Sequence, residues 1–379
     1  MTEWKTYRFG DIVQFNPTER ISKGSLARKV SMDKLTPYCR EVSGYEVETF
    51  TGGMKFRNGD TIMARITPCL ENGKTSLVSF LDDNEVGFGS TEYIVFRAIE
   101  EVTDSKFVYY FVTSPAFRNV AIKSMVGSSG RQRVQQSVLE DLEVALPSLE
   151  EQRRIAGILG AIDDKIENNR RINTNLELQA QALYKQWFVD SSTVKLGDVV
   201  RTTSGGTPSR RHMEFYVGKY GWVKSKELNG SFITNTEESI TDDAIAKSAA
   251  KLLPAKSILI AMYGATVGQY AILSQPMTCN QAVCALLPNE NYPYTYLFMV
   301  AKNIKEELAN KAIGSAQQNI SQVIIKDIDI SSDIEKIKQF HKIVCPHFEV
   351  MEKNQKENEA LSTLRDTSLP KLMNGEIKL

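Results

Sequence analysis

The chain has 379 residues, and its composition of 42% hydrophobic and 24% charged residues is typical of a globular protein. Its 46 basic and 46 acidic residues cancel, which excludes a global positive field that holds a protein on nucleic acid by net charge alone. No apolar run is long enough to cross a bilayer, and residues 1–7 lack a signal-peptide pattern, so we expect no membrane partner. Five cysteines without a Cys-x-x-Cys pair argue against a disulfide framework and predict a cytoplasmic location.

The first part of the chain, residues 1–147, has the pattern of a mixed domain. Short β-branched or aromatic runs bounded by Gly, Asn and Asp predict strands at Thr61–Ile66, Thr75–Phe80 and Glu92–Phe96. Apolar residues at helical spacing predict helical structure over Phe107–Lys123. We therefore expect an α+β domain here.

A long helix is predicted within the next segment, residues 148–190. Acidic residues follow Pro147, and neither proline nor a turn cluster interrupts the chain from there to Phe188. Apolar side chains recur every seven residues, with Asn169 in the same series. A continuous helix of this length would reach roughly 60 Å at about 1.5 Å per residue, and its apolar stripe needs a partner.

The third part, residues 191–332, repeats the pattern of the first, with strands expected at Ser257–Met262 and Ala282–Leu287 and a helix at about Tyr294–Lys311. Four short motifs recur in the same order at a nearly constant offset, so one unit of about 190 residues has been used twice. The pairs are Phe9–Val13 with Leu196–Val200, Ile62–Arg65 with Leu259–Met262, Gly127–Val134 with Gly314–Ile320, and Leu139–Leu142 with Ile325–Ile328.

The last part, residues 333–379, is expected to hold a second long helix from about Asp333 to Met373. Pro346 should kink or break it, because proline cannot donate the helical hydrogen bond. Asn169 and Asn358 fall in or near the two apolar seams, where a buried amide fixes register at some cost in stability. Antiparallel pairing of the two helices within one chain is the simpler arrangement, and a coiled coil between two chains is the alternative.

Several fragments imitate catalytic motifs. Residues 291–294 read Asn-Tyr-Pro-Tyr, which resembles the Asn-Pro-Pro-Tyr box of adenine methyltransferases, but no glycine-rich cofactor loop accompanies them. Gly73-Lys74-Thr75 lacks the first glycine of a phosphate-binding loop. The three histidines do not have metal-ligand spacing. We therefore expect no catalytic residue, metal site or cofactor in this chain, and a binding module is favoured over an enzyme.

Polar loops at equivalent places in both halves are the candidate ligand sites. Hydroxyl groups and Arg on a Gly-rich turn suit phosphate contacts, whereas Arg pairs with guanine and Gln or Asn with adenine. The candidate DNA contacts are Arg20, Arg65, Arg131, Gln132 and Arg133 in the first half and Thr207, Ser209, Arg210, Arg211, Lys224, Lys226, Gln317, Gln318 and Asn319 in the second. The alternative is that these are ordinary solvent-facing turns.

The whole chain resembles the specificity subunits of type I restriction–modification systems. Leu146–Ile155 is similar to the "LPPLxEQxxI" run at which the central conserved helix of that family begins. Gly89–Tyr93 and Cys279–Ala282 resemble a motif in the core of its recognition domains, and Thr207–Ser209 is similar to another of its motifs. Residues Ser332–Lys336, where the second helix begins, depart from the pattern because they lack the proline and the Glu-Gln pair.

The resemblance implies an α+β fold with two target-recognition domains in tandem, separated by two long antiparallel conserved helices that form a coiled-coil-like spacer. The implied segments are recognition domain 1 at 1–147, the central conserved helical region at 148–190, recognition domain 2 at 191–332 and the C-terminal conserved helical region at 333–379. Such a chain reads a bipartite double-stranded DNA target with a fixed gap and catalyses nothing itself.

The resemblance also implies partner chains. Two methyltransferase subunits would carry S-adenosylmethionine, and restriction–translocase subunits would use ATP and Mg²⁺. The residues expected to bind the methyltransferase subunits are Glu151, Gln152, Ile155, Ile158, Ile162 and Phe348. Two other functions stay open, a coiled-coil scaffold without DNA specificity and a stand-alone DNA methyltransferase or nuclease.

Overall fold

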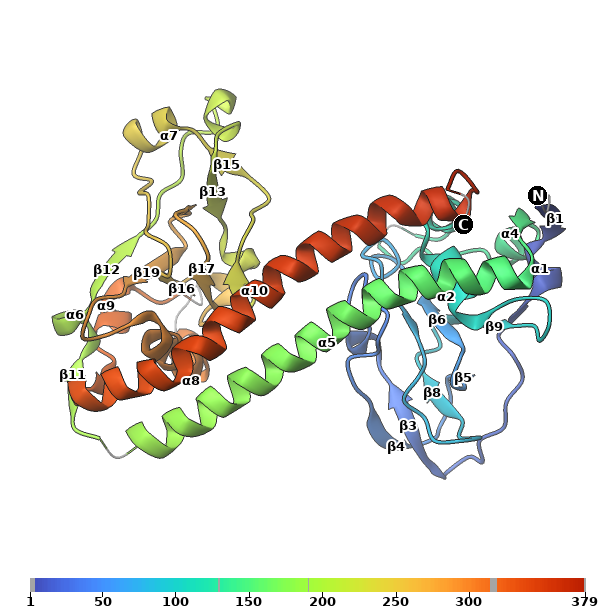
Figure 1. The fold of residues 1–379 in the computed structure, drawn as a ribbon, viewed down its shortest axis with the longest axis horizontal. Coiled ribbons are helices and arrows are strands. Elements are labelled where there is room, and N and C mark those ends of the chain that lie inside the picture. The colour runs from blue at the N-terminus through green and yellow to red at the C-terminus, as the bar shows by residue number, and fades with distance from the viewer. Residues whose placement is uncertain (1–3, 129, 190, 314–318, 378–379) are drawn as a thin grey trace. The chain divides into compact units, whose positions relative to one another are not determined.

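The computed structural model of the protein describes residues 4–128, 130–189, 191–313 and 319–377 (Figure 1). The chain divides into two compact units. Unit 1 combines residues 1–168 with 359–379, and unit 2 comprises residues 169–358. Within the described ranges, no helix is long and apolar enough to span a membrane. Each unit contains a mixed region, which we call the first module (residues 4–147) and the second module (residues 191–332).

The first module contains two sheets and a pair of terminal strands. One four-stranded sheet has the strand order β2-β9-β6-β7 and is antiparallel, and the other has the order β4-β3-β8-β5 with β3 and β8 parallel. Strand β1 pairs with β10. The bounds are β1 Lys5–Arg8, β2 Val13–Phe15, β3 Leu26–Val30, β4 Glu46–Thr49, β5 Met54–Phe56, β6 Thr61–Ala64, β7 Thr75–Leu77, β8 Gly87–Gly89, β9 Tyr93–Ala98 and β10 Glu143–Leu146.

The helical structure predicted over Phe107–Lys123 is confirmed, but it consists of two helices that meet at Ser114. Asp104 caps the first helix by accepting a hydrogen bond from the amide of Phe107, and Ser114 caps the second. Pro115 follows Ser114 and begins the second helix, since a proline at that place loses no helical hydrogen bond. The helices of the module are α1 Phe9–Ile12, the 3₁₀ turn η1 Met32–Lys34, α2 Ser105–Thr113, α3 Pro115–Lys123 and α4 Gln136–Glu140.

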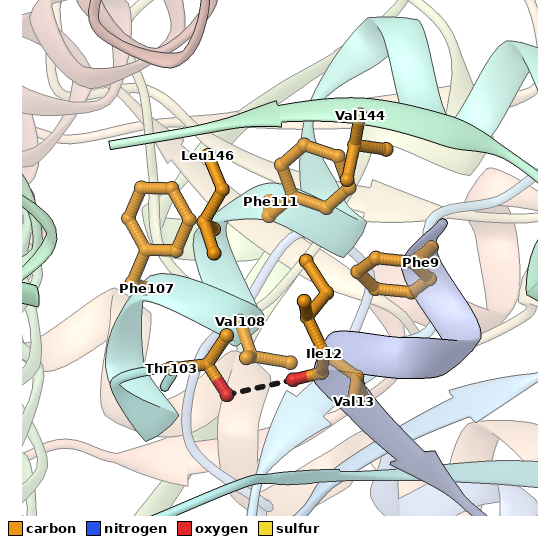
Figure 2. Close-up of a pocket in the computed structure, with 9 residues that line it drawn as sticks. All are labelled: Phe9, Ile12, Val13, Thr103, Phe107, Val108, Phe111, Val144 and Leu146. Atoms are coloured by element: carbon orange, nitrogen blue, oxygen red, sulfur yellow. Dashed lines mark hydrogen bonds between the residues drawn. The ribbon is translucent and has the colours of Figure 1, made fainter. Parts of the chain in front are cut away.

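The helix α2 packs beside α1 and β10 in the first module (Figure 2). Nine residues line a small apolar pocket there: Phe9, Ile12, Val13, Thr103, Phe107, Val108, Phe111, Val144 and Leu146. The hydroxyl of Thr103 donates a hydrogen bond of 2.9 Å to the carbonyl oxygen of Ile12. None of the residues that line this pocket has a charged side chain. The pocket is therefore part of the packed core and is not suited to bind a polar ligand.

The second module repeats the central strand pairing of the first, although its two sheets have five and three strands instead of four each. Its larger sheet has the order β12-β19-β16-β17-β14, its smaller sheet the order β15-β13-β18, and β11 pairs with β20. The bounds are β11 Thr193–Lys195, β12 Arg201–Ser204, β13 Tyr220–Val223, β14 Phe232–Ile233, β15 Ser239–Ile240, β16 Ile258–Ala261, β17 Tyr270–Leu273, β18 Thr278–Cys279, β19 Val283–Leu287 and β20 Asp329–Ser331. The parallel pair β13 and β18 corresponds to β3 and β8, so the repeat predicted from the motifs is confirmed in the topology.

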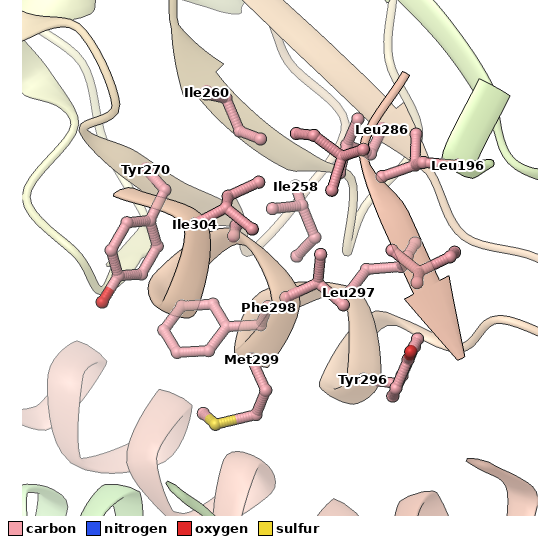
Figure 3. Close-up of a cluster of buried hydrophobic side chains, with 14 of the residues drawn as sticks. Leu196, Ile258, Ile260, Tyr270, Leu286, Tyr296, Leu297, Phe298, Met299 and Ile304 are labelled. Carbon is pink, nitrogen blue, oxygen red and sulfur yellow. The ribbon is translucent and has the colours of Figure 1, made fainter. Parts of the chain in front are cut away.

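One long helix, α8 (Tyr294–Ile313), covers the larger sheet of the second module. Its apolar face meets Ile258, Ile260 and Leu286 of the sheet (Figure 3). Full burial of such side chains contributes about 1.5–3 kcal/mol each, which makes this contact the main support of the module. The other helices are α6 Leu196–Val199, η2 Met213–Tyr216, η3 Ser225–Glu227, α7 Asp242–Ala246, η4 Gly264–Thr266 and α9 Gln322–Lys326.

The two predicted long helices are confirmed as α5 (Leu149–Phe188) and α10 (Ile334–Met373). Each contributes one part to unit 1 and the other to unit 2. Within unit 2 they pair antiparallel, because Asn169 of α5 donates a hydrogen bond of 2.9 Å to Asn358 of α10, while Asn173 accepts one of 2.8 Å from Asn354. The prediction that the seam buries Asn169 and Asn358 is therefore confirmed.

Pro346 was expected to kink or break the second helix, and the expected break is wrong because α10 is continuous across it. Pro346 and Lys342 are both exposed, so water can reach the Lys342 carbonyl that would otherwise accept the missing hydrogen bond. Val344 and Phe348 on either side are fully buried. Their packing holds the helical conformation against the cost of the proline.

Candidate nucleic-acid interface

Three distant segments of the first module converge where β6 ends. The amide of Arg65 donates to the carbonyl oxygen of Glu92 at 2.9 Å, and the amide of Val134 donates to the carbonyl oxygen of Arg65 at 2.9 Å. Residues 132–134 therefore lie against the residues that follow β6. This arrangement brings the candidate residues Arg65 and Arg133 to one place beside Glu92.

The side chains of Arg133 and Glu92 form a bidentate ion pair. Nε of Arg133 donates to both carboxylate oxygens at 2.9 and 3.0 Å, and Nη2 donates to Oε1 at 2.6 Å. Nε of Arg65 lies 3.8 Å from Oε2 of the same carboxylate. The hydrogen bonds from Arg133 outweigh the effect of burial and hold the pKa of Glu92 below its ordinary value. The carboxylate therefore stays charged and compensates part of the charge of the two arginines.

The other candidates of the first module lie on exposed turns. Arg20 is exposed and follows Glu19, whose carboxylate accepts hydrogen bonds from Arg57 and Arg97 at 2.6–2.8 Å. Burial alone would raise the pKa of Glu19, but these two arginines lower it below its ordinary value. Arg131 is exposed, whereas the backbone carbonyl of Gln132 accepts a hydrogen bond of 3.0 Å from Thr67.

The same place in the second module has neutral side chains. The amide of Met262 donates to the carbonyl oxygen of Ala282 at 2.8 Å, and that of Ile320 donates to the carbonyl oxygen of Met262 at 2.9 Å. Met262, Ala282 and Asn319 thus take the positions of Arg65, Glu92 and Arg133. Asn319 pairs with Tyr263, and its side-chain oxygen accepts a hydrogen bond of 3.2 Å from the amide of Gly264. The candidates Gln317 and Gln318 lie outside the described residues.

A second group of candidates in the second module surrounds Arg210. Its guanidinium lies 3.9 Å from the ring centre of Tyr216 and 5.3 Å from that of Trp222. Nη2 of Arg210 is 2.7 Å from Oε2 of Glu238. Two aromatic faces and one carboxylate therefore fix the orientation of a partly exposed arginine. The candidates Thr207, Ser209 and Arg211 are exposed on the same loop.

Lys224 and Lys226 face two acidic residues that directly precede β15, Glu237 and Glu238. Nζ of Lys224 contacts Oε1 of Glu238 at 2.5 Å and Oε2 of Glu237 at 3.1 Å, and Nζ of Lys226 contacts Oε2 of Glu237 at 2.7 Å. Hydrogen bonds from these lysines lower the pKa of both glutamates. The structure thus brings Arg210, Lys224 and Lys226 together, with their charges largely compensated.

Sequence reasoning missed these carboxylates. Glu92 lies far from Arg133 in the chain, and Glu237 and Glu238 carry no motif. The contact of Arg210 with Trp222 could not be read from the chain either.

The residues expected to bind a methyltransferase divide into two groups. Ile158 is 43% exposed and Glu151 and Ile162 are half-buried, so these three can meet a partner. Gln152, Ile155 and Phe348 are buried in the core of this chain itself and are withdrawn from that role.

Gln152 instead supports the first module. Its amide nitrogen donates to the carbonyl oxygens of Val102 and Pro147, each at 3.0 Å, and its oxygen accepts from the amide of Asp104 at 3.0 Å. A fully buried amide needs such partners, since an unpaired one costs about 1–3 kcal/mol. Gln152 therefore ties the beginning of α5 to the loop before α2.

The Asn-Tyr-Pro-Tyr motif at residues 291–294 serves as the turn that begins α8. The side-chain oxygen of Asn289 accepts from the amides of Asn291 and Tyr292 at 3.0 and 2.9 Å, which is a local turn motif. Within the described part of the chain, no three His, Cys, Asp or Glu side chains are grouped so that they could hold a metal ion.

Comparison with known proteins places both modules in one family. The family model described as "Type I restriction modification DNA specificity domain" matches residues 1–178 and 189–339. The HindI specificity subunit of Haemophilus influenzae is 25% identical over an alignment covering 100% of each chain. The MjaIX specificity subunit of Methanocaldococcus jannaschii is 26% identical over 73% of this chain and 69% of that one.

A solved structure shares the fold. The type I restriction-modification S subunit from M. genitalium has a TM-score of 0.58 and 17% identity, with 98% of this chain and 96% of that chain covered. Since the family model matches well over half of the residues, the chain belongs to the type I restriction–modification DNA specificity family, whose members supply sequence specificity and are not themselves catalytic.

Proposed function

We propose that residues 1–147 and 191–332 are two target-recognition domains that read the two halves of a bipartite DNA sequence. The observation that carries this proposal is the pair of equivalent sites beyond β6 and β16, where one topology presents different side chains. A shared scaffold with different contact residues is how two homologous domains come to read two different sequences.

The proposed contacts differ between the modules. Arg133 suits a guanine edge, because its guanidinium can donate to O6 and N7, whereas Asn319 suits an adenine edge. The exposed Arg20, Arg131 and Arg211 suit phosphates, which position the duplex without reading it. The remaining proposed contacts are Arg65, Gln132, Thr207, Ser209, Arg210, Lys224, Lys226, Gln317 and Gln318.

We further propose that the conserved helical regions, 148–190 and 333–379, bind two methyltransferase subunits. Ile158 and Ile162, with Glu151 near the beginning of α5, are the contacts that remain available on the surface. In this assembly, S-adenosylmethionine lies in the methyltransferase, and ATP and Mg²⁺ lie in restriction–translocase subunits. The target adenine must leave the duplex to reach the methyltransferase pocket, so this chain binds and places the DNA. A cytoplasmic location follows from the same proposal.

The test is to co-express the chain with its cognate methyltransferase in a host free of DNA methylation and to sequence the genome for N6-methyladenine. We expect one bipartite motif with a fixed gap. Arg133→Ala should relax one half of the motif, and Asn319→Ala the other half, because each side chain lies in a different module. A verified complex that neither methylates nor binds DNA would contradict the proposal and favour a protein-binding scaffold.

A further inference from the structure

Glu92 lies at the centre of the candidate site of the first module and has no role in the proposed contacts. Its side chain is 24% exposed and meets Arg133 at 2.6–3.0 Å and Arg65 at 3.8 Å. A surface ion pair contributes only about 0–1 kcal/mol to stability. Stability of the fold is therefore a weak reason for a carboxylate between two side chains that are expected to meet DNA.

The internal repeat shows that the fold itself does not require this carboxylate. In the second module, the three equivalent positions hold Met262, Ala282 and Asn319, and the backbone hydrogen bonds around them are the same. Where the two arginines are replaced by neutral side chains, the glutamate is replaced as well. The carboxylate thus accompanies the arginines, which indicates that its purpose concerns their charge and orientation.

The geometry leaves Arg133 able to read a base. A guanidinium has five N–H donors in a planar fork, and Glu92 engages Nε and one side of Nη2. Nη1 and the outer hydrogen of Nη2 remain at the end of the fork, which is the pair that matches O6 and N7 of guanine. A phosphate gains less from contact with Arg133, because Glu92 already compensates the charge of Arg133. The carboxylate of Glu92 also repels the phosphate.

We propose that Glu92 is a specificity-determining residue, which orients Arg133 toward a base edge and offsets the charge of Arg65 and Arg133 so that phosphate contact alone gains little. This inference rests on the proposed DNA-reading function. The lowered pKa of Glu92 agrees with it, since the carboxylate stays ionised at neutral pH. The near-zero net charge of the chain agrees too, because most of its candidate basic contacts have acidic partners.

The test is Glu92→Gln in complex with the cognate methyltransferase, once the target of the wild-type complex is known. Binding is measured by fluorescence anisotropy over a KCl series on the target duplex and on a scrambled duplex. On the scrambled duplex we expect about two- to fivefold tighter binding. The slope of log K against log [KCl] should steepen by up to about 0.9 for each arginine released. On the target duplex, discrimination against base changes should fall in one half-site alone.

Asp141→Asn is the matched control, because Asp141 pairs with Arg8 at 2.5 Å on an exposed part of the same module. It should leave affinity, slope and discrimination unchanged. Arg133→Gln should lose discrimination in the same half-site without tighter binding to the scrambled duplex. Wild-type behaviour of Glu92→Gln on both duplexes would overturn the inference, and so would an equal loss of discrimination in both half-sites. A wild-type complex without any bipartite target would instead contradict the proposed function.

Discussion

The two modules are attached to the long helices by different chemistry at equivalent positions. In unit 1, Asp163 of α5 accepts hydrogen bonds from the hydroxyl of Tyr110 at 2.7 Å and from Arg365 of α10 at 2.8 Å, and its side chain is only 3% exposed. In unit 2, the position that corresponds to Asp163 holds Phe348. The ring of Phe348 is fully buried, with its centre 5.2 Å from that of Phe298.

This difference shows that the repeat has kept its topology while the interactions that hold it have changed. A buried carboxylate is tolerated only while its partners are in place, because removing one leaves a charge without compensation. A buried aromatic cluster depends on volume and shape and is insensitive to charge. The two units should therefore respond differently to substitution, salt and pH, even though they share a fold.

The largest effect is expected for Arg365→Ala, which leaves the carboxylate of Asp163 buried with Tyr110 as its remaining partner. Such a loss costs about 3–5 kcal/mol. Hydrogen exchange of the amides of α2 should report it in unit 1, while the amides of α8 in unit 2 serve as the internal reference. A loss below about 1 kcal/mol would mean that water replaces Arg365, and the ionic attachment would then be unimportant.

Phe348→Ala should loosen unit 2 by a similar amount for a different reason. Removing a fully buried ring leaves a cavity between α8 and α10 and costs about 3–5 kcal/mol. The loss should be the same at low and high salt, since no charge is involved. Exchange of the α8 amides, measured at two KCl concentrations, checks this. A strong salt dependence would contradict the apolar account of this attachment.

These attachments illustrate what the sequence could and could not predict. The helices α5 and α10 were predictable, because an apolar repeat of seven residues runs through both without a turn cluster. The break at Ser114 was also readable, since serine before proline is a strong signal for the beginning of a helix. At Pro346 a break was expected and the helix continues. Nothing in the neighbouring sequence indicated this, because exposure of the unpaired carbonyl to water depends on how the helix packs.

The candidate site was less predictable than the fold. Composition and motif placed Arg65 and Arg133 among the polar loop residues, but the pairing of Arg133 with Glu92 depends on how the loop lies against the residues that follow β6. Ion pairs between residues distant in the chain leave no periodicity to detect. At Gln152 the sequence motif indicated an important residue but not its role. Its buried hydrogen bonds show that the role is structural.

A smaller effect is expected at the seam between the helices. Asn169 is fully buried and donates to Asn358 at 2.9 Å and to Glu357 at 2.8 Å, whereas Asn173 is half-buried. Asn169→Ala leaves the Asn358 oxygen without that donor and should cost about 1–3 kcal/mol. Asn173→Ala, the matched control, should cost less because Asn173 is itself half-buried, so water can take the place of its side chain. Equal losses by hydrogen exchange of the α10 amides would show that burial does not distinguish the two pairs.

The smallest expected effect is a change of stability with pH, which should have opposite signs for one glutamate in each of the two units. Glu167 of α5 and Glu352 of α10 are equivalent glutamates near the centre of each helix. Burial, with Asp163 nearby, raises the pKa of Glu167 above its ordinary value of 4.5 in spite of its bonds with Arg40. Burial also acts on Glu352, but hydrogen bonds, led by that from Lys256, lower its pKa below 4.5.

The contributions of Glu167 and Glu352 to stability should therefore shift in opposite directions with pH. Above 4.5, folded unit 1 retains the Glu167 proton longer than the unfolded chain does, so its stability falls as pH rises through the folded pKa. The contribution of Glu352 is present above 4.5 and is lost as pH falls through its lowered pKa. Relative to wild type, Glu167→Gln should gain stability as pH rises, and Glu352→Gln as pH falls. Hydrogen exchange of the amides of α2 and α8 between about pH 3.5 and about pH 7, a range that includes the ordinary glutamate pKa of 4.5, measures both. Shifts of the same sign would show that Arg40 dominates over burial at Glu167, which would make the two attachments electrostatically alike.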